Sequence, residues 1–275
     1  MAFNYEHYLR EDKFPHILCA GCSHGSILKA IIRAIDALGL HRDETAMISG
    51  IGCSSRIPGY VDLNTLHTTH GRSLAFGTGI KFAKPELTVI AVSGDGDATA
   101  IGGNHFIHAC RRNLDMTLFV FNNFIYGMTG GQFSPTTPQT KYATTAPYGM
   151  VEPNFDIAQL AIGAGATFVA KTTAYHAATM HTLLAKAIAH KGFSVVEILS
   201  GCPTAYGRKN DLKTPVSLLN WFKDIAVPKA KADSMTEEEL NGKTVIGILH
   251  EEKREEFLEG YNKLVEGVQE RKMKM

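Results

Sequence analysis

The sequence predicts a doubly wound α/β fold built on a mostly parallel sheet. Short apolar runs rich in Val, Ile and Phe alternate along the chain with stretches of helical character, which is the pattern of βαβ units. Each run closes with Gly, Asn or a turn, as buried parallel strands do. Polar and Gly-rich clusters follow several of these runs, and ligands of open α/β sheets bind at that edge. We therefore expect a ligand site along the carboxyl ends of the strands.

The expected elements follow one another from residue 24 to residue 199. Ile and Leu recur at helical spacing over residues 24–38, which predicts an amphipathic helix. Further helices are expected over residues 103–112, 156–164 and 175–190. The expected strands are Ala46–Ser49, Leu87–Ser93, Met116–Phe121, Thr167–Ala170 and Phe193–Leu199.

Four polar clusters are expected to converge on one edge of this sheet. They are GIGCSSR (50–56), GDGD (94–97), NN (122–123) and GCP (201–203). The character of the chain changes after these clusters, and we expect one domain over 1–205 and a C-terminal arm over 206–275. In the arm, residues 229–243 are typical of a loop, 244–249 of a strand and 251–272 of a charged helix.

Composition excludes several classes of function. The 275 residues are 44% hydrophobic and 20% charged, which is ordinary for a globular domain. A formal net charge of +1 gives no reason to expect nucleic acid or an anionic membrane as partner. No apolar run reaches the roughly 18 residues that span a bilayer, and the N-terminal residues do not resemble a signal peptide. A cytoplasmic protein is expected.

The five cysteines do not suggest a disulfide framework, because their number is odd and no export signal is expected. Cys19 and Cys22 form a C-x-x-C pair, which in a reducing compartment indicates a redox pair or a metal site.

Two motifs at the strand ends suit a divalent cation. Gly94-Asp95-Gly96 and Asn122-Asn123 each follow an expected strand. The Asp95 carboxylate and the Asn123 amide oxygen are ligands that Mg²⁺ prefers, and Gly94 and Gly96 allow close backbone approach. Taken singly, both motifs are also common surface turns.

The longer sequence around these motifs resembles the β subunits of 2-oxoacid:ferredoxin oxidoreductases. It reads GDGDATAIGGNHFIHACRRNLDMTLFVFNNFIYGMTGGQFSPTTP. The resemblance runs from about residue 15 to 205. It implies a thiamine-diphosphate-binding fold, in which Asp95, Asn123 and the carbonyl of Ile125 hold Mg²⁺ on the cofactor. It also implies that one [4Fe–4S] cluster is bound by Cys19, Cys22, Cys53 and Cys202.

Other interpretations of the cysteines stay open. Four cysteines also suit structural zinc, and single cysteines can be core residues, which is our interpretation of Cys110. The chain has Ala20 where the family more commonly has Pro, and the ligand spacing is unchanged.

The resemblance also assigns roles to other polar residues. It suggests that Ser54 and Ser55 line the cofactor cleft and that Arg56 pairs with a substrate carboxylate. The alternative for Arg56 is an exposed turn residue. His70 is expected to contact the diphosphate or a reaction intermediate, or to be structural. Asp97 is expected to accept backbone N–H groups near the diphosphate, and the loop 126–137 to cover the thiazolium.

The function implied by this family is oxidative decarboxylation of a 2-oxoacid to acyl-CoA and CO₂, with electrons passed to ferredoxin. The sequence most resembles those of enzymes that act on 2-oxoglutarate. Branched-chain 2-oxoacids and pyruvate are the alternative substrates. An α subunit is expected to supply the pyrimidine-binding domain, with small γ and δ subunits as further partners. The rival functions are a non-redox thiamine decarboxylase, which needs no matched cysteines, and a zinc-binding assembly module.

Overall fold

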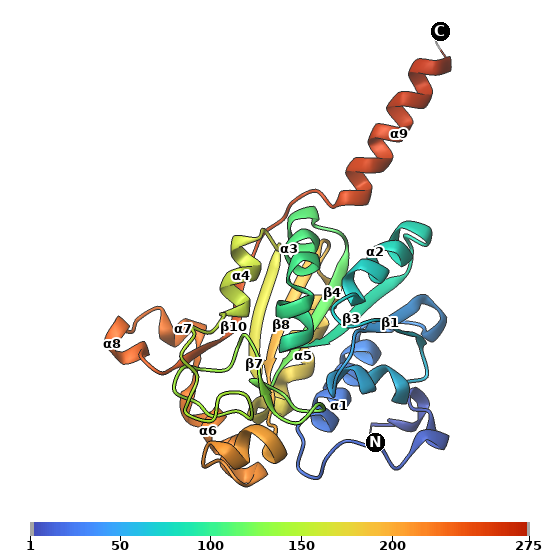
Figure 1. The fold of residues 1–275 in the computed structure, drawn as a ribbon. Helices are drawn as coiled ribbons and strands as arrows, with labels where there is room; N and C mark the ends of the chain where they lie inside the picture. Colours follow the sequence, from blue (N-terminus) through green and yellow to red (C-terminus); the bar gives the residue numbers. More distant parts are fainter. Residues whose placement is uncertain (1–2, 274–275) are drawn as a thin grey trace.

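The computed structural model describes residues 3–273, and in them one eight-stranded sheet has the order β2-β1-β3-β4-β8-β7-β10-β9 (Figure 1). All neighbouring strands are parallel except β7 and β10, which are antiparallel. The strands are β1 (Thr45–Ser49), β2 (Asn64–His67), β3 (Thr88–Gly94), β4 (Met116–Asn122), β7 (Phe168–Thr173), β8 (Phe193–Leu199), β9 (Ala226–Pro228) and β10 (Thr244–Glu251). A separate hairpin pairs β5 (Ile125–Tyr126) with β6 (Gln132–Phe133).

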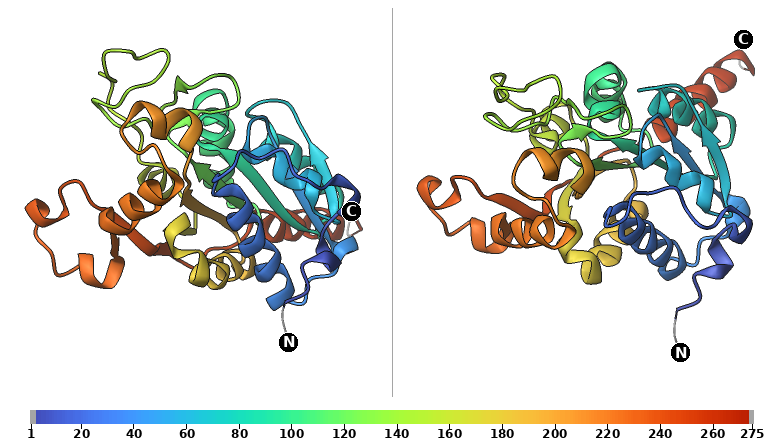
Figure 2. Two further views of the ribbon diagram at one scale, coloured as in Figure 1. Left: turned by 90° about the horizontal axis from the view of Figure 1, so that it is seen from below. Right: turned by 60° about the horizontal axis from the view of Figure 1, so that its bottom comes forward.

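Helices cover both faces of the sheet. Helices α1 and α5 pack side by side on one face, and α3 lies on the other with α2 and α4 (Figure 2). The helices are α1 (His24–Ala37), α2 (Ser73–Ala83), α3 (Gly103–Arg112), α4 (Ile157–Gly163), α5 (Ala177–Ala189), α6 (Pro215–Ile225), α7 (Lys229–Ala232), α8 (Glu237–Leu240) and α9 (Phe257–Met273). The doubly wound, mostly parallel architecture is confirmed.

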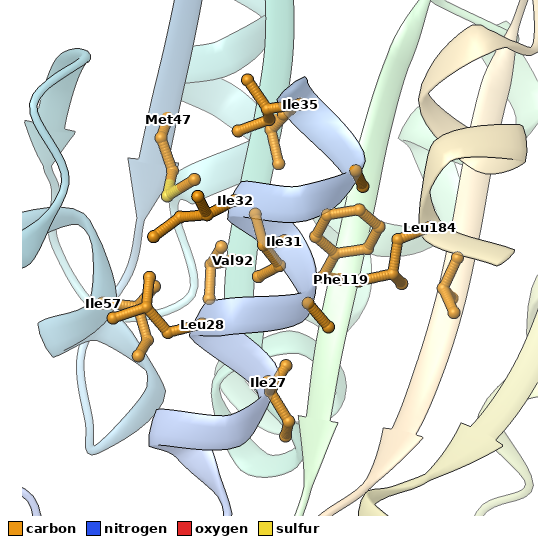
Figure 3. Packing of buried hydrophobic residues seen from close by; sticks show 14 of the residues in the cluster. Ile27, Leu28, Ile31, Ile32, Ile35, Met47, Ile57, Val92, Phe119 and Leu184 are labelled. Carbon is orange, nitrogen blue, oxygen red and sulfur yellow. The ribbon is translucent and has the colours of Figure 1, made fainter. Parts of the chain in front are cut away.

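The core divides into two layers because successive strand residues point to opposite faces. In β4, Phe119 and Phe121 pack towards α1 and α5, whereas Leu118 and Val120 pack towards α3 and α4. Figure 3 shows the first layer, in which the apolar stripe of α1 lies against β1, β3, β4 and α5. Each fully buried side chain of this size contributes about 1.5–3 kcal/mol. The central strands β3, β4 and β8, which are buried along nearly their whole length, are therefore mostly apolar.

All the helices and strands expected between residues 24 and 199 are present. The expectations did not include α2 or β2. Strand β2 is short and largely exposed at the edge of the sheet, so it carries no alternating apolar pattern. Helix α2 contains Gly77 and Gly79, which weaken a helical pattern.

The C-terminal region differs from the expected arm in two ways. The expected loop over 229–243 is wrong in part, because it contains the short helices α7 and α8. A capping box between Thr236 and Glu239 begins α8, since the two side chains satisfy backbone N–H groups that the helix start leaves free. Strand β10 pairs with β7 and so extends the main sheet. The boundary at residue 205 stays a prediction. Helix α9 projects away from the rest of the molecule (Figure 1).

None of the helices within residues 3–273 is both long and apolar enough to cross a membrane.

Candidate functional site

Two adjoining cavities lie at the carboxyl ends of β1, β3, β4 and β8. The first, here the central cavity, is lined by residues that include Ser54, His70, Gly94, Asp95, Gly96, Asp97, Asn123 and Ile125. The second, here the cysteine cavity, has a volume of about 290 Å³ and is lined by residues that include Cys19, Cys22, Cys53, Cys202 and Arg56. They share a wall made by His24, Cys53, Asn123, Gly127 and Met128. The expected convergence of the four polar clusters is confirmed.

Asp95 is a buried carboxylate at the end of β3. Its side chain is 2% exposed, and its Oδ2 accepts hydrogen bonds from Ser134 Oγ at 2.5 Å and Thr136 Oγ1 at 2.7 Å. Burial raises the pKa of Asp95, and the two hydroxyl groups oppose that shift. A carboxylate kept from water in this way is stabilised when a cation lies beside it.

Asp97 joins three loops at the floor of the central cavity. Its Oδ1 accepts the backbone N–H of Gly71 at 2.7 Å and of Ile51 at 3.1 Å, and lies 2.5 Å from His70 Nδ1. Its Oδ2 is buried and has no hydrogen-bond partner among residues 3–273. A Cβ at Gly50 would lie 2.1 Å from the carboxylate, so only glycine fits there. The carboxylate therefore fixes the orientation of His70 and links it to the loops of Ile51 and Gly71.

The turn after β4 is held by its two asparagines. Asn122 Oδ1 accepts the N–H of Phe124 at 3.1 Å, and Asn123 Oδ1 accepts that of Ile125 at 3.2 Å. These bonds stabilise Phe124 in the left-handed region, at a φ of 63°, where non-glycine residues are uncommon. The chain thereby turns back, and Ile125 and Tyr126 lie against the central cavity.

Tyr126 closes the space over the glycines that follow β3. Its hydroxyl donates to the carbonyl of Gly96 at 3.2 Å. A Cβ at Gly96 would lie only 2.3 Å from the ring. The close approach requires glycine at this position, as the GDG motif predicts.

The four cysteines of the expected ligand set come from three distant segments and line one cavity. Burial raises the pKa of Cys22 to about 12 and that of Cys53 to about 11, and the neighbouring cysteines add to both shifts. Among residues 3–273, no three His, Cys, Asp or Glu side chains are placed to hold a single metal ion. Cys110 is fully buried on the core-facing side of α3, which confirms its interpretation as a packing residue.

The three residues after Cys53 lie in different surroundings. Ser54 lines the central cavity, and its buried hydroxyl has no hydrogen-bond partner among residues 3–273. Ser55 is buried but does not line either cavity, and its carbonyl accepts a hydrogen bond from Ser49. Arg56 is exposed and lines the cysteine cavity, 4.0 Å from Met128 Sδ.

Sequence reasoning missed three features of this site. Ser134 and Thr136, within the loop 126–137 that was expected to cover the thiazolium, bind Asp95, and no role was assigned to either residue. His24 lies in the wall between the cavities, two residues after the C-x-x-C pair. Lys171 and Glu197 form a buried ion pair of 3.0 Å beneath the site. The sequence did contain a signal for this ion pair: each of two apolar runs, FVAKTT and FSVVEIL, has a single charged residue inside it.

Comparisons with known proteins agree with this geometry. The family model for the thiamine pyrophosphate enzyme, C-terminal TPP binding domain, matches residues 50–198. The 2-oxoglutarate synthase subunit KorB of Methanocaldococcus jannaschii is 49% identical over 94% of this chain and 96% of its own length. The subunit of the same name from Archaeoglobus fulgidus is 51% identical over 96% of this chain and 95% of its own.

A solved structure of similar fold is the 2-oxoglutarate:ferredoxin oxidoreductase from Magnetococcus marinus with 2-oxoglutarate, coenzyme A and succinyl-CoA bound. It is 34% identical and has a TM-score of 0.87 over 97% of this chain and 91% of that chain.

Proposed function

This chain belongs to the 2-oxoglutarate synthase KorB family within the thiamine pyrophosphate enzymes, and on that premise we propose that it is the β subunit of a 2-oxoglutarate:ferredoxin oxidoreductase. The reaction is oxidative decarboxylation of 2-oxoglutarate with coenzyme A, and ferredoxin accepts the electrons. One observation carries the proposal. Four cysteines from three segments line a cavity that shares a wall with the cavity of Asp95 and Asn123.

The central cavity has a volume of about 80 Å³, which is less than a whole thiamine diphosphate occupies, and its residues fit the diphosphate with Mg²⁺. A buried carboxylate at Asp95 has no cation beside it, and Asp97 Oδ2 and Ser54 Oγ are buried without partners in residues 3–273. Asp95, Asn123 and the carbonyl of Ile125 would hold the metal. Gly94, Gly96 and Ser54 would adjoin the diphosphate, and Asp97 would fix the loops around it.

The cysteine cavity fits a [4Fe–4S] cluster held by Cys19, Cys22, Cys53 and Cys202. A single zinc ion draws four sulfurs to one point through bonds of about 2.3 Å. Here the four residues surround a space of about 290 Å³, which suits a group of several atoms. When bound, thiamine diphosphate supplies the nucleophilic carbon and electron sink for decarboxylation, and the cluster takes up single electrons.

The chain's own residues bind and orient the substrate. Arg56 lines the cysteine cavity beside Met128, a residue of the wall shared with the central cavity. From there its guanidinium would pair with a carboxylate of the 2-oxoacid. Asp97 holds His70 through Nδ1, so Nε2 is the ring nitrogen left for a ligand. The segment from Tyr126 to Thr129 lines the central cavity and would shield the bound cofactor from water.

The proposal includes partners. An α subunit would supply the pyrimidine-binding domain and its activating glutamate, and small γ and δ subunits would complete the cytoplasmic enzyme. The chain alone would therefore be inactive.

The test is to purify the chain anaerobically with its α subunit and follow the visible absorption of the cluster. We expect bleaching by 2-oxoglutarate with coenzyme A, and none by pyruvate or 2-oxoisovalerate. Cys202→Ser should lose the absorption, whereas Cys110→Ala, a matched cysteine in the core, should keep it. A colourless protein that contains zinc would refute the cluster, and decarboxylation without bleaching would indicate the non-redox enzyme. Bleaching by a branched-chain 2-oxoacid would change the assigned substrate.

A further inference from the structure

His24 is a buried histidine in the wall between the two cavities. It begins α1, is 1% exposed and lines both the central cavity and the cysteine cavity. Its Nε2 lies 3.3 Å from Ser200 Oγ. Its Nδ1 is buried without a hydrogen-bond partner in the part of the chain from residue 3 to 273. A buried ring nitrogen without a partner lowers the stability of the fold, which suggests that this position serves a function.

The same residue adjoins two of the four cavity cysteines. It lies two residues after Cys22 in the chain, and it lines both cavities together with Cys53. The ring packs edge-on against Phe121 with the centroids 5.0 Å apart. Ser200 in turn donates its N–H to the carbonyl of Asn122 at 2.8 Å. His24 is thus tied to the ends of β4 and β8, to the C-x-x-C segment and to the loop after β1.

Groups that hydrogen-bond beside metal ligands orient those ligands and tune the bound metal. For iron–sulfur clusters, hydrogen bonding and solvent exposure set the reduction potential. His24 bears on both conditions, because its Nδ1 has no partner among residues 3–273 and its buried side chain forms part of the wall that Cys53 also lines.

We propose that His24 is a positioning residue for the cysteine-bound cluster: it orients Cys22 and Cys53, and its free Nδ1 sets the reduction potential at which the cluster accepts electrons from the central cavity. This inference rests on the proposed function, because it requires a cluster in the cysteine cavity.

The test compares three variants in the complete, anaerobically purified enzyme. His24→Phe keeps the packing on Phe121 but removes both nitrogens. His24→Asn places an amide near the position of Nδ1. His190→Asn is the matched control, because His190 also pairs through Nε2 with a hydroxyl, that of Thr167 at 2.8 Å, and packs on Phe168. It lies at the amino ends of β7 and β8, away from both cavities.

The readouts are the midpoint potential, the electron paramagnetic resonance spectrum of the reduced cluster and the rate of iron loss to a chelator. We expect His24→Phe to shift the potential and to lose iron roughly 10–100-fold faster. His24→Asn should lie closer to the parent, and His190→Asn should match it. The affinity for thiamine diphosphate with Mg²⁺ should fall much less in His24→Phe than in Asp95→Asn, because Asp95 would hold the metal.

Different outcomes separate this inference from the proposed function. A parent enzyme without iron and sulfide would overturn both. A parent with the cluster whose His24→Phe variant keeps the same potential and iron-loss rate would overturn the inference alone. A variant that loses thiamine affinity with its potential unchanged would also overturn it, since His24 would then serve the central cavity.

Discussion

Two carboxylates are buried almost equally at this edge of the sheet, yet their charges are balanced differently. Glu197 is 3% exposed and lies 3.0 Å from Lys171 Nζ. Asp95 is 2% exposed, its Oδ2 accepts hydrogen bonds from the hydroxyl groups of Ser134 and Thr136, and no Lys, Arg or His within residues 3–273 forms an ion pair with it. An ionised carboxylate out of water is costly unless it is paired. The chain therefore supplies the cation for Glu197, and the cation for Asp95 is expected from outside the chain.

The two carboxylates belong to one hydrogen-bonded network. Glu197 Oε1 accepts from Asn122 Nδ2 at 2.7 Å, and Asn122 Oδ1 lies 3.0 Å from Thr136 Oγ1. Thr136 then reaches Asp95. At the other end, Lys171 also binds Asp156, which caps α4. The network holds the long segment 124–156 at its start, its middle and its end. The paired carboxylate thus positions the loop that faces the unpaired one.

The largest effect on stability is expected when Lys171, the cation that pairs with Glu197, is replaced. Lys171→Met leaves Glu197 buried and uncompensated, so we expect the free energy of unfolding to fall by about 3–5 kcal/mol. Urea denaturation at fixed subunit concentrations measures this. Lys186→Met, which removes an exposed lysine from α5, should change stability by less than about 0.5 kcal/mol.

A second substitution sharpens this prediction. Adding Glu197→Gln to Lys171→Met removes the uncompensated charge and should restore part of the lost stability. A double variant as unstable as the sum of the two single variants would contradict the proposed pairing.

The second-largest effect concerns the stabilisation by the metal ion that is expected beside Asp95. Asp95→Asn keeps the shape of the side chain and removes its charge. We expect the stability without ligand to stay the same or to rise, because a buried charge has gone. The gain from Mg²⁺ and thiamine diphosphate, about 2.7 kcal/mol at 100 times the dissociation constant, should disappear in a thermal shift assay.

Glu197→Gln is the matched control for Asp95→Asn. It should lower the stability without ligand but retain most of the ligand-dependent gain. If Asp95→Asn were stabilised by the ligand as strongly as the parent, Asp95 would not be a metal ligand.

The sequence was sufficient for the strands β1, β3, β4, β7, β8 and β10, for the helices α1, α3, α4, α5 and α9, and for the convergence of the polar clusters. These follow from local periodicity and from the rule that parallel strands end at one edge. The network around Asp95 could not be predicted, because Lys171, Glu197 and Thr136 are far apart in sequence and meet only in the folded chain. Ser54 and Ser55 look equivalent in the sequence, and only the backbone path after β1 separates their environments.

The smallest effect on stability is expected at a third carboxylate, that of Asp115, which lies away from the site. It tests whether lysines of the chain balance the charge of buried carboxylates. Asp115 lies 3.2 Å from Lys81 Nζ and 3.0 Å from Lys191 Nζ. Burial alone would raise the pKa of Asp115, but the two ammonium groups outweigh it and lower the pKa below its ordinary value of 3.8. Its contribution to stability is thus fully present above pH 3.8 and is lost as the pH falls through the lowered pKa.

Asp115→Asn should therefore lower stability at pH 7 and flatten its decline below about pH 4. Urea denaturation across the acid range measures both effects. Asp43→Asn is the control, because the Asp43 side chain is 87% exposed, and its stability should follow the pH curve of the parent. An Asp115→Asn curve parallel to that of the parent would mean that lysines of the chain do not balance this carboxylate. The contrast between Asp95 and the internally paired carboxylates would then lose its basis.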